Sequence, residues 1–265
     1  MTIRVETPRG TFAVEVSGDP AGQTIALVAG LGDDHSSWDP VMHALNPTFR
    51  VVRYDNRGIG GSDITPGPYS AAQLADDAHA VVEALGVGPV VGIGSSLGGA
   101  TCQEWALKYP EDLTGLVLSS TWAETDPYLD TFMALWRRLV GGGRTEELMD
   151  SLLLYCFSGE YLRDNPGVID EFRSAPVPDL TGFGAMTVAC TTHDTVDRLG
   201  DIDIPTLVVI GTRDILIRPE LSKRLAAGIP GAAMVEIDAA HMTFWEQPET
   251  WIAAVSGWAA TSTSG

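Results

Sequence analysis

The chain alternates between short apolar runs and longer amphipathic stretches. Eight segments have the composition of strands, and we expect strands at residues 4–6, 12–16, 24–28, 49–54, 89–93, 113–119, 206–210 and 233–237. In the first two, polar and apolar residues alternate on either side of a Pro-Arg-Gly turn at 8–10, which predicts an amphipathic hairpin. The other six are nearly continuous apolar runs, as expected for parallel strands that are covered on both faces.

Helical stretches separate these strands. We expect helices at residues 38–44, 71–85, 99–109, 219–227 and 248–259. Because strands and helices alternate along the chain, the pattern predicts an α/β fold with a doubly wound sheet.

The alternation is interrupted between about residues 123 and 200, where the sequence is helical, irregular and rich in aromatic residues. Insertions into α/β sheets lie over the carboxyl ends of the strands, where ligands bind. We therefore interpret 123–200 as a cap, inserted after the sixth strand. Residues 1–122 and 201–260 then form the core, and 261–265 form a disordered tail.

Composition and charge narrow the function classes. At 265 residues the chain can bury one large core, and no segment has the 18 consecutive apolar residues of a membrane span. The N-terminus has no apolar signal core, which predicts a cytoplasmic protein. A formal charge of −19 argues against nucleic-acid and membrane partners. The sequence does not indicate an oligomeric state.

Cysteine usage gives no sign of a metal site or a disulfide framework. The three cysteines are far apart in the sequence, at 102, 156 and 190, and there is no Cys-x-x-Cys pair. We expect free buried thiols in a reducing compartment, and no metal or cofactor.

The most informative segment is residues 90–99 with the stretch that follows it: an apolar run at 90–93, then Gly-x-Ser-x-Gly centred on Ser96, then an alanine-rich helical stretch. A serine on a sharp strand-to-helix turn has its hydroxyl exposed at the positive end of a helix, and glycines at 94 and 98 let the backbone turn that tightly. The pentapeptide alone is weak in a chain with 29 glycines, and a glycine-rich turn can also hold a phosphate. The flanking strand and helix favour a nucleophilic Ser96.

A serine nucleophile needs a base, and the base needs an orienting carboxylate. His241 follows the last predicted strand, and Asp214 follows the strand before it, so both lie in loops at the carboxyl edge of the sheet. The order Ser96, Asp214, His241 is the one expected for this arrangement. Asp214 taken alone would pass for an ordinary turn aspartate.

The other four histidines have different expected roles. His43 and His79 fall in predicted helices, where surface or packing roles are expected. His193 stands beside Asp194 and could pair with it, whereas His35 follows the first parallel strand and could line the pocket.

Hydrolysis also needs two N–H donors for the oxyanion. One is expected from the residue after the nucleophile, Leu97, and the other from Leu31 in the glycine-rich loop after the strand at 24–28.

With these residues in place, the chain resembles the α/β-hydrolase superfamily along nearly its full length. The supporting stretches are Arg53 to Ser62, Ile204-Pro205, Glu246-Gln247-Pro248-Glu249 and, in the oxyanion loop, Gly30 to Asp33 followed by Trp38-Asp39-Pro40. Within the superfamily it is most similar to 3-oxoadipate enol-lactonases. The resemblance implies a mostly parallel eight-stranded sheet flanked by helices and a helical cap after the sixth strand. Ala29, Ser95 and Ala240 depart from residues that are common in the family, but none of them replaces a catalytic group.

Substrate contacts are expected from Trp122, Trp136, Phe157 and Met242. Trp122 could equally serve as a packing anchor, and most of the aromatic side chains in 123–200 would fill the core of the cap itself. Four arginines in this region (Arg137, Arg138, Arg163 and Arg173) could bind a substrate carboxylate, although solvated surface charge is the simpler role for each.

The sequence thus predicts a cofactor-independent serine hydrolase that cleaves an ester or lactone of a small organic substrate. The same residues could instead perform carbon–carbon bond hydrolysis, thioester cleavage, perhydrolysis, or an acyl transfer or elimination in secondary metabolism. A non-catalytic binding protein of the same fold is a third possibility, because fold does not fix activity.

Overall fold

The centre of the computed structural model, which describes residues 1–174 and 180–262, is an eight-stranded sheet in the order β1-β2-β4-β3-β5-β6-β7-β8. The strands are β1 (Thr2–Thr7), β2 (Gly10–Gly18), β3 (Thr24–Val28), β4 (Arg50–Tyr54), β5 (Val90–Ser95), β6 (Leu113–Ser119), β7 (Thr206–Gly211) and β8 (Ala233–Ile237). Strand β2 pairs antiparallel with β1 and β4, and all other pairs are parallel. All eight predicted strands and the mostly parallel sheet are confirmed.

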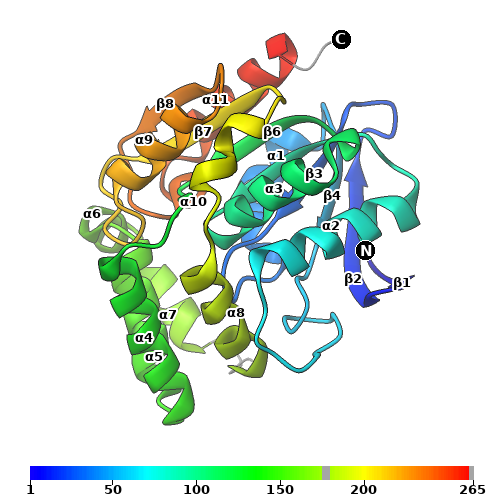
Figure 1. Cartoon of the computed structure of the whole chain (residues 1–265). Helices are drawn as coiled ribbons and strands as arrows, with labels where there is room; N and C mark the ends of the chain where they lie inside the picture. Colours follow the sequence, from blue (N-terminus) through cyan, green and yellow to red (C-terminus); the bar gives the residue numbers. More distant parts are fainter. Residues whose placement is uncertain (175–179, 263–265) are drawn as a thin grey trace.

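Helices cover both faces of the sheet (Figure 1). One face carries α2 (Ala71–Leu85), α3 (Leu97–Lys108) and α9 (Pro219–Gly228); the other carries α1 (Asp39–Leu45), α10 (Thr243–Glu246) and α11 (Pro248–Ser262). Alternate residues of β3 show how the sequence achieves this: Ala26 and Val28 pack with the first set, and Ile25 and Leu27 with the second. The continuous apolar run at 25–28 is therefore buried on both faces of the sheet.

The predicted helices are confirmed, with local reasons for their ends. Helix α2 starts at a capping box, in which the Ser70 side chain accepts from Gln73 N and the Gln73 side chain accepts from Ser70 N, and it ends at Gly86 in the left-handed conformation. Helix α10 was not predicted. Helix α11 is longer than predicted and includes residues 261 and 262 of the expected tail, whereas 263–265 lie outside the described residues.

In the described part of the stretch between β6 and β7, five α-helices lie together beyond the end of the sheet (Figure 1). They are α4 (Pro127–Gly141), α5 (Thr145–Cys156), α6 (Gly159–Asp164), α7 (Pro166–Ser174) and α8 (Leu180–Thr192). Many of their apolar side chains form one cluster with Trp122, Leu216 and Ile217, which belong to loops at the carboxyl ends of β6 and β7. The division into a core and a cap at 123–200 stays a prediction. Short 3-10 helices are η1 (His35–Trp38), η2 (Pro110–Asp112) and η3 (Val196–Asp201).

The direction of winding changes between β3 and β5. From β3 the chain moves outward to β4, and from β5 it moves the other way to β6, so the loops that follow β3 and β5 diverge. Ligands of open α/β sheets bind at such a point. Within the described part of the chain, no helix combines the length and the apolar character needed to cross a membrane.

Candidate active site

Ser96 occupies the turn between β5 and α3 in a strained backbone conformation, with φ 54° and ψ −119°. Within residues 1–174 and 180–262, the only other residue besides glycine with a positive φ is Ser120. Two glycines make the turn possible: a Cβ at Gly94 would lie 2.2 Å from Gly98 O, and a Cβ at Gly98 would lie 2.0 Å from Val28 O. Strain of this kind costs roughly 1–3 kcal/mol and persists where the surrounding structure enforces it, often at functional sites.

His241 and Asp214 lie together in the loops after β8 and β7. Nδ1 of His241 is 2.7 Å from Oδ2 of Asp214, and both side chains are buried. Because a carboxylate can only accept, Nδ1 carries the proton and Nε2 is left as an acceptor. The other oxygen, Oδ1 of Asp214, accepts from the backbone N–H groups of Leu216 and Ile217 at 2.9 and 2.8 Å. The carboxylate is thereby fixed in one orientation and holds the imidazole in one tautomer.

Two backbone N–H groups beside Ser96 have no protein acceptor. Leu97 is the first residue of α3, and Leu31 lies in the loop after β3. Among the described residues, neither of these amides donates a hydrogen bond to another protein group. The carbonyl of Ser96, by contrast, accepts from Thr121 Oγ1 and from the N–H groups of Gly99 and Ala100, which holds the start of α3 in place.

Ser96 and His241 line one pocket of about 130 Å³. Its wall is mainly apolar and comes partly from the loops of the sheet and partly from helices α4, α5, α7 and α8. The four side chains proposed for substrate contact, Trp122, Trp136, Phe157 and Met242, all line it. Sequence reasoning missed several apolar wall residues, namely Leu129, Met133, Leu148, Phe183, Leu216 and Ile217.

The pocket also contains a carboxyl group, that of Asp33, which sequence reasoning did not select as a site residue. Burial raises the pKa of Asp33 to about 6, and Asp34 adds to this, whereas the charge of His241 acts in the opposite direction. The signal that would have found Asp33 is its position: it follows β3, at the same edge of the sheet as Ser96.

None of the four cap arginines belongs to the described lining of the pocket. Arg137 reaches Thr187 O and Asp130, Arg163 pairs with Asp164, and Arg173 pairs with Asp150. Arg138 is exposed on α4. These contacts favour the surface-charge role for the arginines over the binding of a substrate carboxylate.

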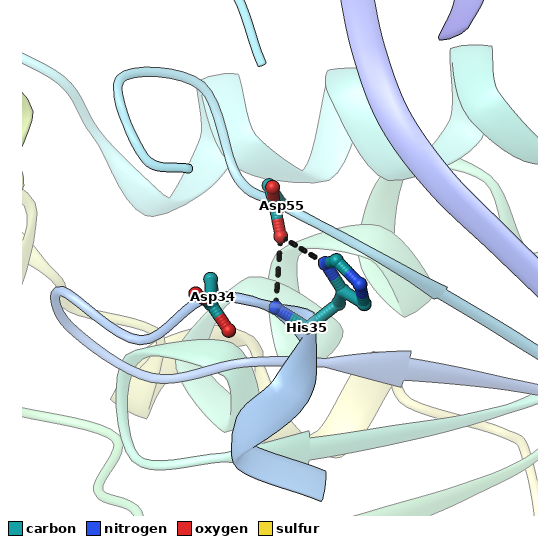
Figure 2. A group of neighbouring side chains, drawn as sticks. All are labelled: Asp34, His35 and Asp55. Atoms are coloured by element: carbon teal, nitrogen blue, oxygen red, sulfur yellow. Dashed lines mark hydrogen bonds and ion pairs between the residues drawn. The ribbon is translucent and has the colours of Figure 1, made fainter. Parts of the chain in front are cut away.

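His35 does not line the described pocket and instead belongs to a cluster with Asp34 and Asp55 (Figure 2). The candidate ligand atoms of the three lie within 4.8 Å of one another, which is close enough to share a metal ion. Hydrogen bonds explain the cluster, however. Oδ1 of Asp55 accepts from His35 N and Nδ1 at 2.8 and 2.6 Å, Oδ2 of Asp55 accepts from Gly61 N, and Asp34 caps the helix η1. The cluster joins the loops that follow β3 and β4.

His193 does not form the expected hydrogen bond with Asp194. Its Nε2 lies 3.3 Å from Gln103 Oε1, and Gln103 in turn donates to Trp122 O at 2.9 Å. The pairing differs from the expectation because these residues meet through the packing of α3 against the chain after α8, and not through neighbouring positions in the sequence. His193 thus supports Trp122, a wall residue of the pocket, from behind.

The stability of the protein is expected to depend on pH through His193. Burial lowers its pKa from 6.5 to about 4, despite the favourable charge of Glu104. Between these values the unfolded chain binds a proton that the folded protein does not, so the free energy of unfolding decreases as the pH falls from 6.5 towards 4. The resulting loss in the free energy of unfolding reaches about 3 kcal/mol when the pH has fallen to 4.

A His193→Gln variant should lack this contribution. Urea unfolding at pH 7 and pH 5 gives the advantage of the wild type, which is its free energy of unfolding minus that of the variant. We expect this advantage to be about 2 kcal/mol smaller at pH 5 than at pH 7. His43→Gln, at a side chain that is 60% exposed, serves as the control. An advantage of equal size at both pH values would contradict the prediction.

The carboxylate of Glu246 connects the loop of His241 to the start of α6. It accepts from Ser158 N at 2.6 Å, from Ser158 Oγ at 2.8 Å and from Ala240 N at 3.3 Å. Beside it, Met242 N donates to Cys156 O at 3.0 Å. The histidine loop and the α5–α6 connection therefore hold each other in place.

Comparisons with known proteins agree with this architecture. Residues 23–248 match the model of the alpha/beta hydrolase fold family. A protein of Azorhizobium caulinodans named "Putative carbamate hydrolase RutD" is 31% identical over 221 residues, which cover 82% of this chain and 83% of that protein. The crystal structure of the enol-lactonase from Burkholderia xenovorans is 28% identical with a TM-score of 0.90, covering 97% of this chain and all of the other.

A thermophilic esterase from Thermogutta terrifontis, with malate bound, is also similar, with 27% identity, a TM-score of 0.88 and complete coverage of both chains. The relatives named here are thus described as hydrolases of different bonds on one common architecture. The family match spans most of the chain, and the mostly parallel sheet with its winding change between β3 and β5 agrees with it. The chain belongs to the alpha/beta hydrolase family.

Proposed function

We propose that the protein is a serine hydrolase that cleaves a carboxylic ester or lactone of a small organic substrate. The observation that carries the proposal is that His241, which Asp214 holds through a hydrogen bond, lines the same pocket as a strained Ser96. A base held in one tautomer, with Nε2 as acceptor, can take the proton of a serine hydroxyl.

In this proposal Ser96 Oγ attacks the substrate carbonyl while His241 Nε2 accepts its proton. The carbonyl electrons move onto oxygen, which the free N–H groups of Leu31 and Leu97 stabilise. Collapse of the tetrahedral intermediate expels the alcohol, which receives the proton from His241, and leaves an acyl group on Ser96. Water, deprotonated by His241, then releases the acid. Asp214 stabilises the imidazolium that forms twice in each cycle.

Side chains from helices α4, α5, α7 and α8 would enclose the substrate opposite Ser96 and so act as the cap. Trp122, Trp136, Phe157 and Met242 supply apolar contact area, which suits an organic acyl or alcohol group of modest size. Carbamates are a second candidate substrate class, supported by the 31% identity to the RutD protein. Comparing the rates for an ester and for the carbamate of the same alcohol separates the two classes.

A serine-directed reagent tests the proposal. A fluorophosphonate is expected to add covalently to Ser96, as located by peptide mass spectrometry, and Ser96→Ala should abolish the addition. The neighbouring serine provides a matched control, so Ser95→Ala should still be modified at Ser96. Modification that persists in Ser96→Ala would refute the assignment of the nucleophile.

A further inference from the structure

The carboxyl group of Asp33 sets the charge of the pocket wall. Among the described residues that line it, Asp33 is the only carboxylate, and there is no lysine or arginine. The remaining wall is apolar apart from serines, cysteines and His241. A charged group of a bound substrate would therefore meet one fixed charge that is negative whenever Asp33 is ionised.

Asp33 lies close to the proposed nucleophile. A methyl group added at Gly30 would lie 3.1 Å from Oδ2 of Asp33 and 3.4 Å from Cβ of Ser96, so the carboxyl and the serine flank the same glycine. In the described part of the chain, no hydrogen bond or ion pair joins the Asp33 side chain to another protein group; burial and the nearby charges of His241 and Asp34 are what act on it. The next residue behaves differently: Oδ1 of Asp34 accepts from Ser36 N at 2.7 Å and caps η1. The oxygens of Asp33 are thus left for the contents of the pocket.

The charged and titratable groups around Asp33 come from three segments. His241 faces it from the loop after β8, Asp34 lies beside it, and the Cys156 thiol approaches from the end of α5. Burial raises the pKa of the Cys156 thiol well above its usual range, so this group stays neutral. With a pKa of about 6, Asp33 is ionised at neutral pH.

We propose that Asp33 determines the charge selectivity of this pocket. Its carboxylate disfavours acyl groups that carry a negative charge near the scissile carbonyl, and it favours neutral acyl groups that can donate a hydrogen bond, or cationic ones. The inference rests on the proposed function, because it takes Ser96 as the reacting group. The inference predicts that lactones bearing a carboxylate are poor substrates, although the enol-lactonase resemblance would imply them. Two like charges about 5 Å apart at a partly buried site correspond to roughly a 10- to 100-fold difference in rate.

A matched pair of reagents tests the proposal without knowledge of the natural substrate. Two fluorophosphonates of equal chain length are used, one ending in a carboxylate and the other in the isosteric carboxamide. The second-order rate constant for modification of Ser96 is measured for each at pH 8. The wild-type protein is expected to react roughly 10- to 100-fold faster with the carboxamide. In Asp33→Asn this ratio should fall about tenfold, whereas in Asp34→Asn, the matched control, it should stay at the wild-type value.

The pH dependence gives a second readout, which needs no variant. Lowering the pH from 8 to 5.5 protonates part of Asp33, so the wild-type ratio should fall. Comparing the two reagents at each pH removes any change in the reactivity of Ser96 that they share. A wild-type ratio near one, or a ratio that Asp33→Asn leaves unchanged, would overturn the inference while the proposed function stands. If neither reagent modifies Ser96, the proposed function itself fails.

Discussion

An Asp214→Asn variant should keep its fold and lose about 10⁴-fold in kcat. The amide oxygen can still accept from Leu216 N and Ile217 N, so its NH₂ group is left facing His241. Because NH₂ only donates, Nδ1 must become the acceptor, and the ring proton moves to Nε2. With the proton on Nε2, His241 can no longer accept a proton from Ser96 there. The loss is measured as kcat for an ester that the wild type hydrolyses.

The control for this variant lies in a neighbouring loop. Asp238 is 81% exposed and pairs with Arg213, so Asp238→Asn should retain wild-type turnover. The urea midpoint of Asp214→Asn should stay close to that of the wild type, because its two backbone hydrogen bonds survive. A variant that kept more than a tenth of the wild-type kcat would show that Asp214 does not fix the tautomer of a catalytic base.

The largest stability loss is expected for Gly98→Ala, at about 4 kcal/mol. The added Cβ would lie 2.0 Å from Val28 O and 2.8 Å from Ala29 O. Neither carbonyl can move aside easily, since Val28 is paired in the centre of the sheet and Gly98 lies in the first turn of α3. Relief of the clash requires the helix to move away from the sheet, which would also displace Ser96. Urea unfolding followed by tryptophan fluorescence measures the loss.

Gly141→Ala is the matched control for the same substitution. Gly141 ends α4 with a negative φ, and a Cβ there meets no atom within 4 Å. Alanine is the better helix residue, so this variant should be unchanged or more stable by up to about 1 kcal/mol. If Gly98→Ala cost less than about 1 kcal/mol, close contact between α3 and the end of β3 would not be required for the fold.

The sheet was predictable because burial on both faces leaves a local signature. Runs such as 25–28 and 207–210 are apolar at every position, and each begins after a threonine. The positions of Ser96, Asp214 and His241 followed from the same reasoning, since each comes directly after a strand end. Local sequence therefore placed the three residues at one edge of the sheet, and packing supplied the hydrogen bond between His241 and Asp214.

Pairings across long stretches of chain were not predictable. His193 was expected to meet its neighbour Asp194 but bonds to Gln103, 90 residues away. His35 was considered for the pocket, yet Asp55 holds it on the other side of its loop. The wall residues Leu216 and Ile217 have no distinguishing local pattern, and hydrogen bonds from their N–H groups to Asp214 Oδ1 hold them in a loop at the pocket. Such contacts depend on how helices, strands and loops pack against one another. Local patterns in a single sequence do not show that packing.

The carboxylate of Glu246 has a consequence for engineering. A chimaera that exchanges only the stretch between β6 and β7 with another family member has two crossover points, one on each side of that stretch. Here, however, the acceptor for Ser158 is Glu246, 88 residues downstream, which also bonds to the loop of His241, the proposed base. A chimaera without a glutamate at the position of Glu246 would leave the loop of His241 less firmly held, even though every exchanged helix folded correctly. The smallest interchangeable module is therefore discontinuous, and it includes the histidine loop.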